Sequence, residues 1–195
     1  MQRVLYPICF GGLGLARLRA NSFDIDPRYR GHESWVNGAQ IHGIYSVKGE
    51  LISEVKSRSC NFALWWDGDL LREILDKNYI AKWNWHESVL DTLLVDAAST
   101  SNNGTKATPV LSADLLGDWR EEVIWRTRDN QALRIYTTTL PTTYRFRTLM
   151  HDPIYRLGIA WQNTAYNQPP HTGFYLGEGM VRPPQKEMYT PVYAK

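Results

Sequence analysis

A chain of 195 residues is long enough to form one domain with a sizeable buried core. Its 22 basic and 20 acidic side chains leave a formal net charge of +2, and no run of Lys or Arg forms a nucleic-acid patch. Eight Trp and 11 Tyr suit both the stacking of sugar rings and the core of a β-sheet. We therefore expect no nucleic-acid partner and, in the absence of a long apolar run, no membrane partner.

The N-terminal stretch MQRVLYPICFGGLGLARLRAN combines a basic residue with a short apolar segment, as secretory signal peptides do. Pro7 and the paired glycines interrupt that segment, so we do not expect it to act as a signal peptide. Cys9 and Cys60 allow one disulfide but no disulfide framework, and they cannot form a zinc site without histidine partners. Cysteine usage therefore leaves both redox compartments open.

Short apolar runs separated by turn signals follow one another along most of the chain, which is typical of an all-β fold. The expected strands cover residues 39–47, 61–66, 121–127, 132–139 and 156–162. The best helical candidate is LLREILDK at 70–77, which is brief and lies between strand-like neighbours. The Pro-rich end of the chain, residues 183–195, is expected to extend along a surface or to fray.

Carboxylates precede several of these strands in a repeated pattern. In SADLLGDWREEVIWR, at 112–126, Asp118 and Glu122 come directly before an apolar run. In WWDGDLLREIL, at 65–75, Asp69 and Glu73 are spaced identically, since 118 − 69 = 49 and 122 − 73 = 49. A looser third copy, FDIDPRYRGHESW, runs from Asp24 past Glu33 to Trp35. A period of roughly 40 to 50 residues is typical of the blades of a β-propeller.

A hard cation gives a physical reason for such acidic loops. Calcium binds six to eight oxygen ligands, and a glycine-containing turn can bring carboxylates and backbone carbonyls together around it. The candidate calcium ligands are Asp114, Asp118 and Glu122 in one loop, and Asp67, Asp69 and Glu73 in another. The spacing differs from the calcium loop of helix-loop-helix proteins. The alternative interpretation is a pair of polar turns with partly solvated acids.

Two further loops have compositions that favour binding. The segment AASTSNNGTKATP is a polar loop around Lys106, and YNQPPHTGFYLG, at 166–177, combines Tyr166 with two prolines that restrict its shape. Loops on a rigid β-scaffold commonly carry binding and catalytic residues. The alternative for Lys106 is a solvent-exposed lysine without a function, and for Tyr166 a structural tyrosine.

Three strings carry a resemblance to a known family: NFALWWDGDLLREILD, NNGTKATPVLSADLLGDWREEVIWR and YRLGIAWQNTAYNQPPHTGFYLG. Together they resemble the C-terminal part of a polysaccharide lyase family 11 rhamnogalacturonan lyase, over roughly residues 32 to 180 and about the last third of such a protein. The resemblance implies the last blades of an eight-bladed, calcium-containing β-propeller over residues 24–182. Residues 1–23 do not resemble the family, and residues 183–195 form the tail.

The resemblance also implies a reaction. Rhamnogalacturonan lyases cleave the rhamnose-galacturonate backbone of pectin by β-elimination, in which the proton at C5 is removed and the glycosidic oxygen at C4 departs. Such a reaction needs a base near C5 and positive charge near the uronate carboxylate. By resemblance, Lys106 supplies the base or the positive charge, Asn103, Gly104 and Thr105 lie beside the sugar, and Tyr166 contacts rhamnose. No arginine partner is assigned.

Two functions from different classes are therefore carried forward. The first is a rhamnogalacturonan lyase, or a C-terminal fragment of one, acting on rhamnogalacturonan I and secreted or held at the cell surface as the family is. The second is a non-catalytic, calcium-stabilised β-module that binds pectic polysaccharide or a protein partner. In either case, exposed blade edges favour self-association.

Overall fold

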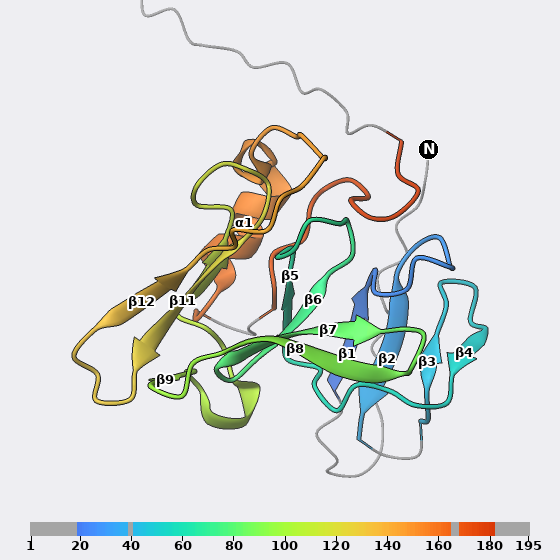
Figure 1. The fold of residues 1–195 in the computed structure, drawn as a ribbon, viewed down its shortest axis with the longest axis horizontal. Helices are drawn as coiled ribbons and strands as arrows, with labels where there is room; N and C mark the ends of the chain where they lie inside the picture. Colours follow the sequence, from blue (N-terminus) through green and yellow to red (C-terminus); the bar gives the residue numbers. More distant parts are fainter. Residues whose placement is uncertain (1–18, 39–40, 165–167, 182–195) are drawn as a thin grey trace, which may run out of the picture.

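The computed structural model describes residues 19–38, 41–164 and 168–181, and within them the chain forms three four-stranded sheets and one α-helix (Figure 1). The first sheet contains β1 (Arg19–Phe23), β2 (Glu33–Asn37), β3 (Ile44–Tyr45) and β4 (Leu51–Ser53). The second contains β5 (Phe62–Leu64), β6 (Glu73–Asp76), β7 (Tyr79–Asn84) and β8 (Val89–Val95). The third contains β9 (Ser99–Thr100), β10 (Leu111–Ala113), β11 (Glu122–Thr127) and β12 (Leu133–Tyr136).

Every strand pair in these sheets is antiparallel, and the first two sheets follow chain order from one edge to the other. The remaining elements are helical: η1 (Gly104–Lys106), η2 (Leu149–His151) and α1 (Pro153–Trp161). No helix among the described residues is both long and apolar enough to cross a membrane. The prediction of an all-β fold is therefore confirmed, with one helix added.

Successive sheets pack face to face because their strands alternate side chains between two faces. Ala63 and Ile74 of the second sheet pack with Phe23, Trp35 and other residues of the first sheet. On the opposite face, residues of β5, β6 and β7 pack against β11 of the third sheet; these are Phe62, Leu64, Leu75, Ile80, Val123 and Trp125. The second sheet is thus buried on both sides.

Two predicted elements were wrong, each for a local reason. Residues 70–77 were predicted to be helical, yet Glu73–Asp76 form β6; all four residues are buried, and a strand buried on both faces lacks an alternating pattern. Residues 156–162 were predicted to be a strand, yet Pro153–Trp161 form α1. The missed signal was Asp152, whose side chain accepts from the Ile154 N–H as an N-cap, followed by proline at the first helical position.

The predicted strands at 61–66, 121–127 and 132–139 correspond to β5, β11 and β12. Of the strand predicted over 39–47, only Ile44–Tyr45 is paired as β3, and residues 39–40 lie outside the described residues. The first strand, Arg19–Phe23, begins before the boundary drawn at residue 24. The tail 183–195 also lies outside the described residues.

One glutamate closes the same loop in each sheet. Glu33, Glu73 and Glu122, called the loop glutamates below, are the first residues of β2, β6 and β11. Each lies opposite the last residue of the strand before it, which is β1, β5 or β10. Each Oε2 accepts two backbone N–H groups, from the residues two and three positions after that strand end. The donors and distances are Ile25 (2.9 Å) and Asp26 (3.0 Å), Trp66 (2.8 Å) and Asp67 (3.4 Å), and Leu115 (2.8 Å) and Leu116 (3.0 Å).

A second repeated contact joins neighbouring sheets. The residue before the loop glutamate donates its N–H to a carbonyl just after the first strand of the preceding sheet. Arg72 donates to Asp24 at 2.7 Å, and Glu121 donates to Trp65 at 2.7 Å. The sequence repeat at an offset of 49 residues is therefore a repeat of hydrogen bonds as well as of residue types.

Between the second and third sheets this contact is reinforced by a buried ion pair. The Arg72 guanidinium lies 3.3 Å from Glu121 Oε2, stacks over Trp65 at 4.1 Å and is 2% exposed. Glu121 Oε2 also accepts the Trp65 N–H at 2.9 Å, and its Oε1 accepts the Tyr155 hydroxyl of α1 at 2.7 Å. Burial raises the pKa of Glu121 and lowers the pKa of Arg72, and each charge opposes the shift of the other. The β5–β6 loop and α1 therefore meet at the carboxyl group of the residue that precedes β11.

Replacing Glu121 by Ala should lower the free energy of unfolding by about 3 to 5 kcal/mol, because it leaves the buried Arg72 charge without its partner. Urea unfolding followed by tryptophan fluorescence measures this loss. Glu87→Ala is the matched control, since Glu87 is exposed, and its effect should stay within about 0.5 kcal/mol. Equal effects of the two substitutions would contradict a structural role for Glu121.

Candidate functional site

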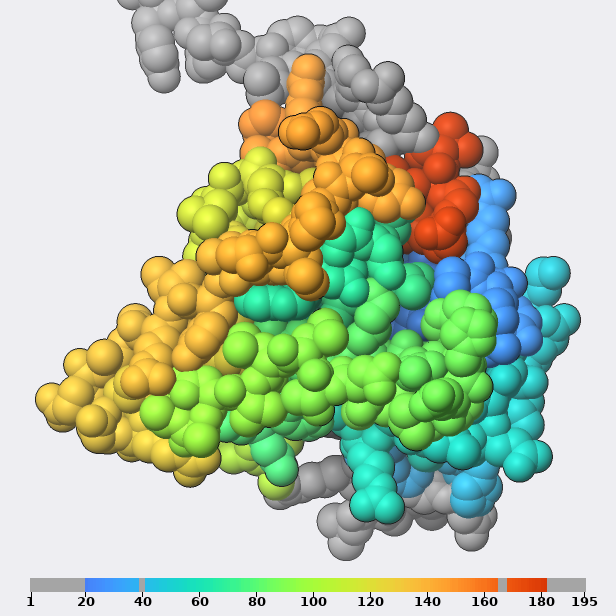
Figure 2. Space-filling model, viewed as in Figure 1, coloured from blue at the N-terminus to red at the C-terminus, as the bar shows by residue number. Residues whose placement is uncertain are grey.

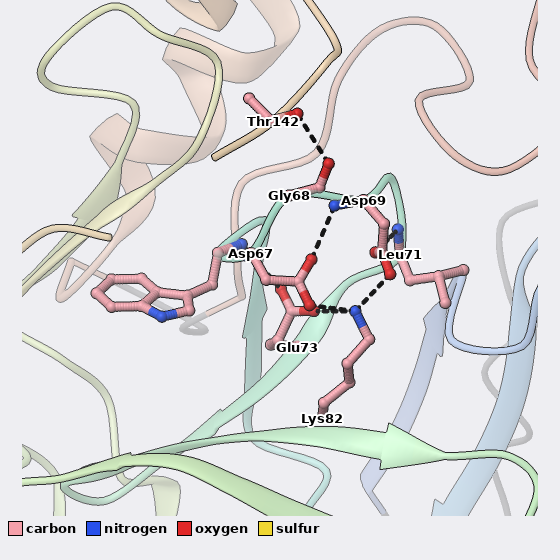
Figure 3. Close-up of polar contacts among 8 residues, drawn as sticks. Asp67, Gly68, Asp69, Leu71, Glu73, Lys82 and Thr142 are labelled. Carbon is pink, nitrogen blue, oxygen red and sulfur yellow. Dashed lines mark hydrogen bonds and ion pairs between the residues drawn. The ribbon is translucent and has the colours of Figure 1, made fainter. Parts of the chain in front are cut away.

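The loop between β5 and β6 brings three predicted calcium ligands together. Oxygen atoms of Asp67, Asp69 and Glu73 all lie within 4.8 Å of one another. Short side-chain contacts shape the loop: Asp67 Oδ1 accepts the Asp69 N–H at 2.9 Å, and Asp69 Oδ1 accepts the Leu71 N–H at 2.9 Å (Figure 3). This group of carboxylates is the one that the sequence repeat predicted in the second sheet.

The loop is held from outside by the segment that follows β12. Thr142 Oγ1 donates to the Gly68 carbonyl at 2.8 Å. A side chain at Gly68 would collide with the Pro141 carbonyl oxygen, so the close approach of the two backbones requires glycine. Figure 2 shows the orange segment after β12 lying against the teal loop of the second sheet. The loop thus has little room to rearrange.

A lysine lies among these three carboxylates. Lys82 reaches them from β7, and its Nζ donates to Asp67 Oδ2, to Asp69 Oδ2 at 2.6 Å and to Glu73 Oε1 at 3.1 Å (Figure 3). Burial alone would raise the pKa of Asp67, but the hydrogen bond from Lys82 and the Asp69 N–H hold it below its ordinary value. Burial raises the pKa of Glu73 to about 8 against the opposing charge of Lys82.

The second predicted ligand set is not brought together. Asp114 accepts the Gly117 N–H at 2.8 Å and the Leu149 N–H at 2.7 Å, so it anchors its own loop and η2. Asp118 is paired with Arg120 at 2.7 Å. Glu122 accepts two loop N–H groups as a loop glutamate and the Thr137 hydroxyl at 3.0 Å. In the part of the chain that the structure describes, these carboxylates do not form a three-ligand group.

Calcium fits these loops in chemistry but not in arrangement. Three carboxylates are the oxygen ligands that calcium prefers. In the second sheet, however, the Lys82 ammonium already takes an oxygen of all three, and a divalent cation at that place would lie against another positive charge. In the third sheet the carboxylates are directed to separate donors. Calcium binding by these loops stays a prediction from the sequence.

The first sheet contains a further acidic group, which the sequence reading had treated only as a loose copy. Asp24 and Glu33 are fully buried, and Asp24 Oδ2 accepts the Tyr175 hydroxyl at 2.6 Å and the Glu178 N–H at 2.7 Å. Burial raises the pKa of Asp24 to about 7 and that of Glu33 to about 8. Asp24 Oδ1 and Glu33 Oε1 have no hydrogen-bond partner among the described residues. This environment favours the protonated form of each acid.

The NGTK loop between β9 and β10 is a tight, backbone-closed turn. Asn103 and Ala107, at φ 57° and φ 48°, adopt left-handed conformations on either side of η1. Asn102 and Thr108 are paired across its base by two backbone hydrogen bonds of 2.7 and 3.2 Å. Arg126 Nε donates to Asn102 Oδ1 at 3.0 Å. The loop is therefore closed at its base by hydrogen bonds to its own chain and to β11.

The predicted sugar-contacting residues of this loop lie at its surface. Asn103, Gly104 and Thr105 are exposed, and Lys106 is half-buried. The loop precedes β10, whereas Asp114 follows it, so the two predicted sites lie at opposite ends of that strand (Figure 1). Tyr166, the predicted rhamnose contact, lies outside the described residues.

Comparison with known proteins assigns the chain to a family. The model of the rhamnogalacturonan lyase family 11 C-terminal domain matches residues 12–186. The chain belongs to this family.

Two curated relatives from Bacillus subtilis (strain 168) match most of the chain. The rhamnogalacturonan endolyase YesW is 61% identical over 173 residues, covering 89% of this chain and 27% of YesW. The rhamnogalacturonan exolyase YesX is 54% identical over 184 residues, covering 88% of this chain and 30% of YesX. The chain thus spans less than a third of the length of either relative.

Solved structures share this fold. The crystal structure of rhamnogalacturonan lyase YesW superposes with a TM-score of 0.83 at 60% identity, over 89% of this chain and 29% of that one. The rhamnogalacturonan lyase PL11 of Bacillus licheniformis superposes with a TM-score of 0.83 at 57% identity, over 88% and 29%. The described fold is therefore shared with both solved lyases over the matched residues.

Sequence reasoning missed Lys82 although a signal was available. In YIAKWN, at 79–84, a lysine stands between Ala81 and Trp83, both of which are buried. A basic side chain within an apolar strand commonly has a specific partner. The partner could not be named without the register, because continuing the pairing of Ile74 with Ala81 by one residue is what sets Glu73 opposite Lys82.

The raised pKa of Glu33 predicts a pH dependence of stability. The folded chain keeps a proton on this group up to about pH 8, whereas the ordinary value is 4.5. Its contribution to stability is thus complete below about pH 4.5 and is lost as pH rises through about 8. Relative to Glu33→Gln, the native chain should lose about 1 to 3 kcal/mol between about pH 5.5 and 8.5.

Urea unfolding at both pH values, with Glu87→Gln as the control, measures this difference. Glutamine keeps an oxygen that can accept the Ile25 and Asp26 N–H groups, so the variant should remain folded. A native chain and a Glu33→Gln variant with parallel pH profiles would contradict burial as the cause.

Proposed function

We propose that this chain is the C-terminal part of a rhamnogalacturonan lyase that cleaves the rhamnose-galacturonate backbone of pectin by β-elimination. The observation that carries the proposal is the family match over residues 12–186, supported by relatives of 61% and 54% identity that are named rhamnogalacturonan lyases. Because one is an endolyase and the other an exolyase, the proposal concerns the bond that is cleaved and not the mode of attack along the polymer.

The chemistry assigned to Lys106 follows from the reaction. The C5 proton is weakly acidic while the neighbouring uronate carboxylate is charged, so a positive group near the carboxylate stabilises the carbanion-like intermediate. A base must also lie within hydrogen-bond reach of that proton. Lys106 lies in a hydrogen-bonded loop in which Asn103, Gly104 and Thr105 are exposed, which supports contact with a sugar chain. The proposed roles are Lys106 as base or stabilising charge, and Asn103, Gly104, Thr105 and Tyr166 as substrate contacts.

The architecture supports three blades of a β-propeller as part of this proposal. Each sheet is antiparallel and four-stranded, and successive sheets pack face to face along the chain. The same glutamate contact occurs in each, and the same inter-sheet bond joins each pair. The outer strand β12 exposes Leu133 and Ile135, which supports self-association through sheet edges as the sequence predicted; the molecular mass in solution tests it.

The lyase proposal is tested with Lys106→Ala and rhamnogalacturonan as substrate, with product followed by the ultraviolet absorbance of the unsaturated uronide. The variant should lose activity by about 100-fold or more, because a base or stabilising charge contributes roughly that factor. Lys48→Ala is the matched control, since Lys48 is exposed in the turn between β3 and β4.

Normal turnover by Lys106→Ala would contradict the assignment of this residue. A folded native chain that binds the polysaccharide without forming the unsaturated product would instead favour the non-catalytic β-module.

A further inference from the structure

In each of the three loops closed by a loop glutamate, a basic side chain of this protein is paired with an acidic residue of the loop. In the first sheet Arg28 is paired with Asp26 at 2.6 Å. In the third sheet Arg120 is paired with Asp118 at 2.7 Å. In the second sheet Lys82 contacts three carboxylates at once. The three basic residues occupy different positions: Arg28 and Arg120 lie at different points of their loops, and Lys82 lies in β7. The repeat of the sequence therefore does not explain why each loop has one.

The residue opposite the loop glutamate carries a hydroxyl or an ammonium group in every sheet, but only the second sheet has a lysine there. Continuing the printed registers by one residue sets Ser46, Lys82 and Thr137 opposite Glu33, Glu73 and Glu122. In the third sheet the hydroxyl of Thr137 donates to Glu122 Oε1 at 3.0 Å. In the second sheet the ammonium of Lys82 donates to the corresponding Glu73 Oε1 at 3.1 Å. The second sheet thus has a charged donor, Lys82, at the position where the third sheet has a neutral one, Thr137.

The charge of the loop explains the difference. Counted from the end of the strand before the loop, the positions of Asp67 and Asp69 are occupied by Leu116 and Asp118 in the third sheet, and by Asp26 and Arg28 in the first. Only the second loop has acids at both positions. Oxygen atoms of three carboxyl groups lie within 4.8 Å of one another, and one of these groups is fully buried. When ionised, the three repel one another strongly unless a cation lies among them.

The position of Lys82 is fixed by the strand that carries it. Its side chain is 22% exposed and rises from the middle of β7, a strand paired on both sides. The loop above it is fixed by the contact of Thr142 with the Gly68 carbonyl. For a metal ion to bind the three carboxylates, the ammonium would have to leave all of them, and it would then lie unpaired beside a divalent charge.

We propose that Lys82 is the resident cation of the loop of Asp67, Asp69 and Glu73, and that this loop does not take up calcium in the native chain. The proposal concerns the chain whether or not it is catalytic, and it departs from the sequence-based expectation that Asp67, Asp69 and Glu73 bind calcium. It also predicts that removal of the ammonium alone creates a site that binds a divalent cation.

The test compares thermal unfolding in calcium with thermal unfolding in a chelator, for the native chain, Lys82→Met, Lys48→Met and Asp69→Asn. The difference in Tm between the two conditions should be larger in Lys82→Met than in the native chain by several degrees, while Lys48→Met should match the native chain. Asp69→Asn should leave the native difference unchanged, because Asp69 does not bind calcium there. Equal differences in Lys82→Met and the native chain, or a smaller difference in Asp69→Asn, would overturn the proposal.

A second measurement needs no variant and so does not depend on the folding of Lys82→Met. Lys82 of the native chain is acetylated with and without calcium, and the rate is read by peptide mass spectrometry with Lys48 as the internal standard. An unchanged rate at Lys82 supports the proposal. A rise in that rate on adding calcium would show that the metal displaces the ammonium, and would overturn it.

Discussion

A buried glutamate carboxyl group that accepts two loop N–H groups is the contact on which the other features of this chain depend. Glu33, Glu73 and Glu122 each begin a strand and each close the loop that leads into it. Buried backbone N–H groups must be paired, and in these loops a glutamate oxygen accepts them. The side chain therefore takes the place of a strand partner. With the loop fixed, the next residue back is positioned to bond to the preceding sheet, as Arg72 and Glu121 do.

The polar contacts and the apolar core act together at each sheet boundary. Ala63 and Ile74 on one face and Leu64 and Leu75 on the other bury the second sheet, which supplies the hydrophobic stabilisation. Such packing alone tolerates sliding of one sheet over another. The directional bonds of Arg72 with Glu121 fix one alignment instead. In the same way, Lys82 joins the acidic loop to β7 of its own sheet.

The sequence predicted those features that depend on spacing along the chain. The offset of 49 residues identified Glu73 and Glu122 as equivalents, and the structure confirms that they make the same contact. The same offset pairs Asp67 with Leu116, so the loops differ at this position. A repeat of the glutamate does not require a repeat of its neighbours. Lys82 was missed because its partners are set by strand register and not by nearness in sequence. The helix at Pro153–Trp161 was missed because its cap, Asp152, was not weighed against the apolar run that follows.

The measurement that tests this account most directly is amide hydrogen exchange of the loop residues that donate to the loop glutamates. The account predicts that the N–H groups of Ile25, Trp66 and Leu115 exchange as slowly as those within the paired strands, since each is bound to a buried carboxylate. Exchange at all three as fast as in the exposed turns would contradict the claim that one repeated contact closes the three loops.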